Sequence, residues 1–105
     1  MMIRHTAAFI AALLAAGPAL GQDMAAGQKI AETWCSTCHA ITATPQTRSS
    51  DGVAGFAAIA AMPSTTEMSL AAFLNTPHGR MPNFMLSRAE IADVSAYIIG
   101  LRGKR

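Results

Sequence analysis

The two cysteines of the chain, Cys35 and Cys38, lie three positions apart, and His39 directly follows the second. This C-x-x-C-H spacing suits three kinds of chemistry: a disulfide or dithiol redox centre, a structural zinc site, or a covalent anchor for haem. Residues three apart lie on one face of a helical turn, so both thiols can reach the two vinyl groups of one porphyrin edge. The adjoining imidazole is then carried to the iron as an axial ligand.

The remainder of the chain favours the haem anchor over the two alternatives. A thioredoxin-type site needs strands beside its C-x-x-C motif, and no segment alternates polar and apolar residues over a convincing length. A structural zinc ion normally takes four ligands from Cys and His. Beyond residue 21 the candidates are Cys35, Cys38, His39 and His78, and adjacent residues are poorly placed to meet one metal. A disulfide that closes so short a loop constrains little unfolded-chain entropy.

Residues 1–21 have the features of a secretory signal peptide. They begin with basic residues, continue with an apolar run that a Gly-Pro pair interrupts, and end in an A-x-G pattern. The apolar run is shorter than the ~20 residues that a membrane span needs. We therefore expect cleavage before Gln22, export to the periplasm and no stable membrane insertion. Retention of the segment as a membrane anchor is the alternative.

Residues 22–105 are expected to form a single domain, because the segment has no internal repeat and no low-complexity linker. The net charge of the whole chain is +2 at pH 7, and no basic stripe interleaves with aromatic residues, which argues against a nucleic-acid surface. A domain this small is marginal without a disulfide, metal or cofactor. The basic tail of Arg102, Lys104 and Arg105 indicates a solvated helix end.

Helical periodicity predicts an all-α domain of three to four helices. The first helix is expected over residues 24–38, and a short second helix over 56–62 follows a loop rich in Thr, Ser, Pro and Gly. Two S-x-x-E capping boxes, which begin at Ser64 and Ser87, predict the starts of the third and fourth helices. The third helix should end before Pro77.

The chain resembles a small bacterial class I cytochrome c over essentially the whole of residues 22–105. The resemblance rests on the stretches AAGQKIAETWCSTCHA, DGVAGFAAIA, AFLNTPHGRMPNFMLS and EIADVSAYIIGLR. It implies the cytochrome c fold, in which helices pack around one covalently bound haem c. It also implies that Cys35 and Cys38 attach the haem and that His39 is the proximal iron ligand.

Two further expectations follow from the resemblance. The first and last helices should cross, with a contact between Gly27 and Tyr97 that explains a glycine inside the first helix. Related sequences often have a proline after the motif, and its carbonyl group orients the histidine. This chain has Ala54 in the matching stretch, and Pro45 lies elsewhere in the loop. The carbonyl group that accepts the N–H of His39 is therefore left open.

The loop before the last helix offers three candidates for the distal iron ligand, His78, Met81 and Met85. The resemblance favours Met81, because a methionine followed by proline stands where the ligand of the family does. A thioether also stabilises reduced iron and raises the potential relative to two imidazoles. Met85 is expected to be a flexible core residue, and His78 a solvated one. Side chains expected in the haem pocket or core are Trp34, Phe56, Leu74 and Phe84; Arg48 and Arg80 could pair with haem propionates or be solvated.

These features predict an exported one-electron carrier with His/Met-ligated haem c. The sequence has no catalytic acid–base pair and no nucleophile constellation, so we expect an electron-transfer protein and not an enzyme. Its partners should be redox proteins, a donor dehydrogenase and an acceptor oxidase or reductase, and the carrier itself should be a monomer. The alternatives are a haem sensor or peroxidase-like enzyme with a labile sixth ligand, and a haem-free thiol or zinc module.

Overall fold

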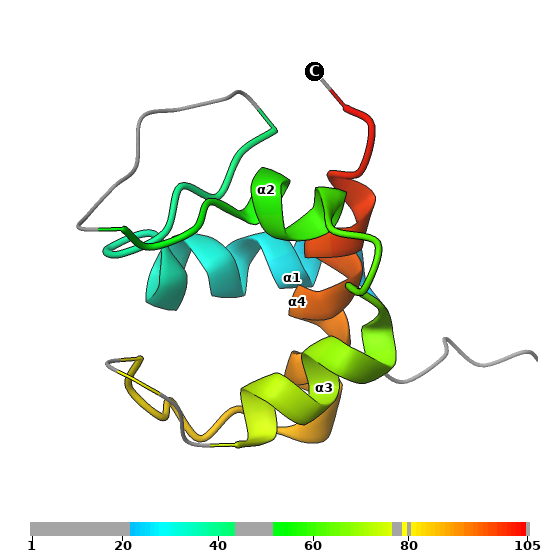
Figure 1. Ribbon diagram of the computed structural model, residues 1–105. Coiled ribbons are helices and arrows are strands. Elements are labelled where there is room, and N and C mark those ends of the chain that lie inside the picture. The colour runs from blue at the N-terminus through cyan, green and yellow to red at the C-terminus, as the bar shows by residue number, and fades with distance from the viewer. Residues whose placement is uncertain (1–21, 44–51, 77–78, 80, 105) are drawn as a thin grey trace, which may run out of the picture.

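The computed structural model describes residues 22–43, 52–76, 79 and 81–104. These residues form four α-helices and one π-helical turn, and they contain no β-strand (Figure 1). The prediction of an all-α domain with three to four helices is thus confirmed. The elements are α1 (Met24–Ile30), η1 (Ala31–Cys35), α2 (Phe56–Ala61), α3 (Glu67–Asn75) and α4 (Arg88–Gly100).

Several sequence predictions fall outside this part of the chain. They concern the signal peptide at residues 1–21 and the residues Pro45, Arg48, His78, Arg80 and Arg105. Among the described residues, no helix is long and apolar enough to cross a membrane.

Helices α1 and α4 cross in close contact at Gly27 (Figure 1). A Cβ atom on Gly27 would overlap the backbone carbonyl of Asp93 and would lie 2.9 Å from Cβ of Tyr97. The predicted contact between Gly27 and Tyr97 is therefore confirmed, and the crossing requires a residue without a side chain. The carboxylate of Asp93 also accepts a 2.8 Å hydrogen bond from the backbone N–H of Asp23, the residue that caps α1.

The buried core joins all four helices to η1. Leu70 from α3 and Ala60 from α2 reach the same cluster as the inward face of α4, and Ile30 from α1 packs against it as a partly buried side chain. The burial of this shared apolar surface is the main force that holds the short helices together. The buried residues of this core cluster are Ala31, Cys35, Phe56, Ala60, Leu70, Val94, Tyr97, Ile98 and Leu101.

The capping box of α4 forms as predicted. The hydroxyl of Ser87 accepts a 3.1 Å hydrogen bond from the N–H of Glu90, and the Glu90 carboxylate accepts one of 2.9 Å from the N–H of Ser87. These bonds satisfy two backbone donors that would otherwise have no partner at the start of the helix. The start of α4, and with it the end of the preceding loop, is therefore firmly fixed.

The capping box of α3 lies two residues later than predicted. Thr66 is the N-cap, and its partner in the box is Ser69, whereas the sequence analysis placed the box at Ser64 and Glu67. The N–H of Thr65 donates to the carbonyl of Met62 at 3.0 Å, which closes a turn around Ser64. Because that turn occupies Ser64, its backbone cannot start the helix.

Two other predictions about helix ends need correction. The first helical segment ends at Cys35, three residues before the predicted boundary. The side chain of Arg102 is exposed but is not free in solvent, because its Nε donates to the carbonyl of Ala60 at 2.8 Å and its Nη2 to that of Thr65 at 2.6 Å. Hydrogen bonds from a charged donor are stronger than neutral ones, so this side chain ties the end of α4 to α2 and to the segment before α3.

Candidate functional site

The C-x-x-C-H motif lies in one tight turn at the end of η1. The N–H of Ser36 donates to the carbonyl of Ala31 at 2.9 Å, which is the five-residue spacing of a π-helical turn. The N–H groups of Cys38 and His39 both donate to the carbonyl of Cys35, at 3.1 and 2.8 Å. These backbone hydrogen bonds place Cys35, Cys38 and His39 in one turn of the chain.

The two thiols of the motif lie in different environments and are not joined by a disulfide. Cys35 is buried in the core, and burial raises the pKa of its thiol to about 11. A thiol with so high a pKa is protonated at neutral pH and is a poor nucleophile, unlike the activated cysteine of a dithiol redox centre. Cys38 is exposed. Among the described residues, no group of three or more His, Cys, Asp and Glu side chains could hold a metal ion.

His39 makes the hydrogen bond that the sequence left open. Its Nδ1 lies 2.6 Å from the carbonyl oxygen of Ala54. Because a carbonyl oxygen can only accept, Nδ1 carries a proton, and Nε2 is the ring nitrogen that is left to bind a metal. The ring of Phe56 packs on the imidazole, with the ring centroids 5.2 Å apart. Ala54 thus supplies the orienting carbonyl without the proline that related sequences often have there.

The backbone after His39 is held from two sides. The N–H of Phe56, at the start of α2, donates to the carbonyl of Ala40 at 2.8 Å. The hydroxyl of Tyr97, in α4, donates to the carbonyl of Ile41 at 2.6 Å. From the sequence only the contact of Tyr97 with Gly27 was expected; its hydroxyl bond was not, because a carbonyl acceptor has no sequence signature. These bonds hold the segment that presents His39.

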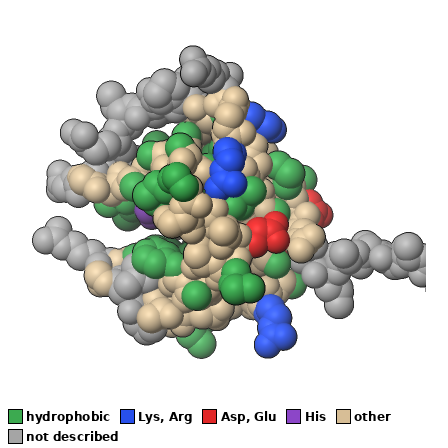
Figure 2. Space-filling model, turned by 45° about the vertical axis from the view of Figure 1, so that its right-hand side comes forward, with side chains coloured by type: hydrophobic (Ala, Val, Ile, Leu, Met, Phe, Trp, Pro, Cys, Tyr) green, Lys and Arg blue, Asp and Glu red, His purple; other side chains and the backbone are tan. Residues whose placement is uncertain are grey.

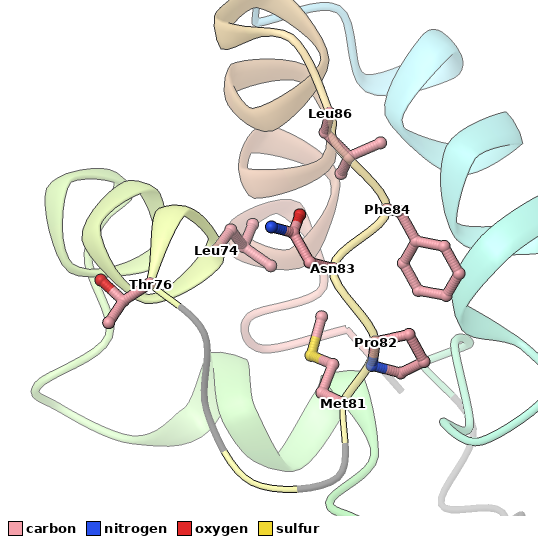
Figure 3. Close-up of a pocket in the computed structure, with 7 residues that line it drawn as sticks. All are labelled: Leu74, Thr76, Met81, Pro82, Asn83, Phe84 and Leu86. Carbon is pink, nitrogen blue, oxygen red and sulfur yellow. The ribbon is translucent and has the colours of Figure 1, made fainter.

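Residues from the end of α3 and from the segment before α4 line an apolar cavity (Figure 3). The thioether of Met81 extends toward the side chains of Leu74 and Asn83 in this view. Leu74 and Phe84 line the cavity, in agreement with their predicted place in the pocket or core. The lining residues are Leu74, Thr76, Met81, Pro82, Asn83, Phe84 and Leu86.

The other methionine of this loop, Met85, does not lie in the core. Its side chain is 82% exposed, and its backbone has a φ of 55° in the left-handed region. The side chain of Asn83 accepts a 2.9 Å hydrogen bond from the N–H of Met85 and stabilises this turn. The prediction that Met85 is a core residue is therefore wrong, because the turn directs it to solvent while Phe84 and Leu86 are partly buried.

The space-filling view shows a hollow between two halves of the molecule, with a histidine side chain inside it and hydrophobic side chains above and below (Figure 2). Of the four predicted pocket or core residues, Phe56 is buried in the core. Trp34 is 48% exposed and packs against Phe84, with the ring centroids 5.4 Å apart. An apolar hollow that contains an oriented imidazole, which follows two cysteines in the same turn of the chain, suits a flat, hydrophobic cofactor with a metal at its centre.

Comparison with known proteins gives two matches. Residues 22–98 match the family described as cytochrome c oxidase, cbb3-type, subunit III, and this match includes the C-x-x-C-H motif, Met81 and Tyr97. The chain is 38% identical over 100 residues to the protein of Bradyrhizobium diazoefficiens named cytochrome c-552, and the match covers 95% of each chain. No solved structure matches the chain.

Proposed function

The chain belongs to the cytochromes c as a small monohaem class I member, and on that premise we propose how it holds its haem and where it works. The cytochrome c fold and the covalently bound haem c expected from the sequence follow from this membership, as does a role in electron transfer. The proposal is that Cys35 and Cys38 attach the haem, that His39 and Met81 are its axial ligands, and that the carrier is exported.

The observation that carries the proposal is the hydrogen bond between His39 and the carbonyl of Ala54. A metal-binding histidine typically donates its second ring N–H to a carbonyl or carboxylate, which fixes the tautomer and the ring orientation. Here the proton lies on Nδ1, so Nε2 is the nitrogen that would bind iron. The packing of Phe56 on the ring adds a steric constraint to the electrostatic one.

The positions of the two thiols support covalent attachment. Cys35 and Cys38 lie in the turn that carries His39, and the N–H groups of Cys38 and His39 both donate to the carbonyl of Cys35. Two thioether bonds from one turn would hold the group on the histidine side of the hollow, since the histidine directly follows the second cysteine. When bound, the haem supplies one-electron Fe(III)/Fe(II) chemistry at a metal whose potential depends on its axial ligands.

The distal assignment to Met81 rests on its place in the apolar cavity and on the stability of its loop. Leu86 packs against the buried core, and Ser87 caps α4, so the loop is fixed at its C-terminal end. A neutral thioether in apolar surroundings favours the lower charge of reduced iron and raises the potential. Met85 points to solvent and fits this role less well. His78, the third candidate, lies outside the described residues.

An iron with both axial positions taken leaves no site for a substrate. The contribution of the chain is then to exclude water with apolar side chains, to hold both ligands and to pass one electron at a time between redox partner proteins. A donor dehydrogenase and an acceptor oxidase or reductase remain the partners we propose. The signal-peptide pattern of residues 1–21 supports export to the periplasm and cleavage before Gln22.

One preparation tests these points together. The chain is expressed with cytochrome c maturation machinery, and its intact mass is measured under denaturing conditions. We expect a chain that begins at Gln22 and carries one haem. The visible spectrum of the reduced protein should not change when carbon monoxide is added. The mass of a haem-free chain would contradict covalent attachment, and a carbon monoxide spectrum would favour the sensor or peroxidase-like alternative.

A further inference from the structure

The indole of Trp34 and the ring of Phe84 lie in contact, with centroids 5.4 Å apart and planes inclined by 36°. Trp34 belongs to η1 and directly precedes Cys35, whereas Phe84 belongs to the loop that carries Met81. The contact therefore joins the segment of the haem-attachment motif to the segment of the distal methionine. In Figure 3 the ring of Phe84 projects from its loop toward the cyan ribbon of the N-terminal helical segment.

Residues 81–86 are held at two points, at Leu86 and at Phe84. Leu86 packs against the buried core next to the N-cap of α4. Between Leu86 and Phe84 the chain turns at Met85, whose N–H donates to the side chain of Asn83. Phe84 is only partly buried and packs on Trp34, which is itself 48% exposed. The contact between the two aromatic rings is therefore one of the contacts that hold the part of the loop next to Met81.

We propose that Trp34 is a positioning residue, which keeps the Met81 loop closed through its contact with Phe84. The inference rests on the proposed function, in which Met81 is the distal ligand. Trp34 is half-exposed and lies outside the core cluster, so its removal should leave the crossing of α1 and α4 intact. A contact between two partly exposed rings contributes modestly to stability. This contact is therefore suited to set how often the loop opens, and not to stabilise the whole fold.

The test uses imidazole as a probe of loop opening in the oxidised holoprotein. Exogenous imidazole binds ferric iron only when the distal ligand has left, so its apparent affinity is the intrinsic affinity reduced by the open fraction. Trp34→Leu and Phe84→Leu should each raise this affinity about three- to tenfold. Trp34→Phe keeps a ring and should have a smaller effect. In the double variant the two effects should not add, because both variants break one contact.

Two further variants serve as controls. Met85→Ala removes an exposed side chain from the same loop and should leave the imidazole affinity unchanged. In a Met81→Ala background, Trp34→Leu should have no further effect, because there is no distal ligand left to hold. If Met81→Ala raises the imidazole affinity but Trp34→Leu does not, the proposed role of Trp34 is wrong and the assignment of Met81 as the distal ligand stands. If Met81→Ala itself has no effect, the ligand assignment fails.

A purely structural role for Trp34 gives a different pattern. In that case Trp34→Leu would lower the midpoint of unfolding in urea, and the imidazole affinity would stay that of the wild type. Fully additive effects of Trp34→Leu and Phe84→Leu would show that the two rings act separately. Either result would overturn the proposal.

Discussion

The hydroxyl of Tyr97 lies 2.6 Å from the carbonyl oxygen of Ile41 and donates a hydrogen bond to it. Cβ of the same residue faces Gly27 at the crossing of α1 and α4. One side chain therefore connects the main helix crossing to the backbone two residues beyond His39. The packing of the helices and the presentation of the proposed proximal ligand are coupled at this position.

Tyr97→Phe should destabilise the holoprotein by about 1 kcal/mol, because the ring stays in place while the carbonyl of Ile41 loses its donor. The contact with Gly27 should survive, so the variant isolates the hydrogen bond. Urea unfolding followed by far-ultraviolet circular dichroism measures the change. An unfolding midpoint equal to that of the wild type would show that water replaces the hydroxyl at no cost.

The ionisation of Tyr97 offers a second test of its environment. Burial, and to a lesser degree the negative charge of Glu32, raises the pKa of Tyr97 above its usual 10.0. A raised pKa in the folded state means that this contribution to stability is fully present below pH 10.0 and is lost as the pH rises through the folded pKa. Since the chain has one tyrosine, an ultraviolet titration should give a midpoint above 10.0 in the folded protein, and Glu32→Gln should lower it. A folded midpoint at or below that of the urea-unfolded chain would contradict the described burial.

Gly27→Ala should destabilise the fold by about 1–3 kcal/mol, although alanine is the better helix former, because its Cβ would overlap the backbone of Asp93. Gly100→Ala is the matched control. A Cβ there would meet only the end of the flexible Met24 side chain, which is 43% exposed and can move aside. Unfolding midpoints of the two variants provide the comparison, and equal losses would show that the crossing does not depend on close approach at Gly27.

Because of the capping box of α4, the free energy of unfolding should fall as the pH becomes acid. Backbone and side-chain hydrogen bonds from Ser87 lower the pKa of Glu90 below its usual 4.5. A lowered pKa in the folded state gives stability that is present above pH 4.5 and is lost as the pH falls through the folded value. Glu90→Ala should therefore unfold at a lower urea concentration than the wild type at neutral pH, and the difference should narrow below pH 4.5. A difference that does not change with pH would exclude the carboxylate as its source.

Local spacing in the sequence was enough to predict part of the site. The C-x-x-C-H motif needs only one turn of chain, and the box between Ser87 and Glu90 needs three residues of separation. The contact of Gly27 with Tyr97 joins distant residues, yet the family resemblance supplied it. In each case the residue type itself carries the information: a thiol, a capping hydroxyl, or a missing side chain.

Other features could not be read from residue types. The acceptor for His39 is a backbone carbonyl, and every residue has one, so only the folded loop identifies Ala54. Its residue type alone indicated that Arg102 is a solvated cation, whereas in the fold two carbonyl groups accept hydrogen bonds from its guanidinium. The exposure of Met85 depends on a turn that the Asn83 side chain stabilises, and apolar character alone suggested the opposite.

The central claim is that Met81 is the distal ligand, opposite His39, in a closed electron carrier. Its most direct test is the far-red absorption of the oxidised protein, where an iron–thioether bond gives a weak charge-transfer band. We predict that the wild type has this band, that Met81→Ala abolishes it and allows the reduced protein to bind carbon monoxide, and that Met85→Ala keeps it. A band that survives Met81→Ala but disappears in Met85→Ala would contradict the assignment, as would an iron that opens only in His78→Ala.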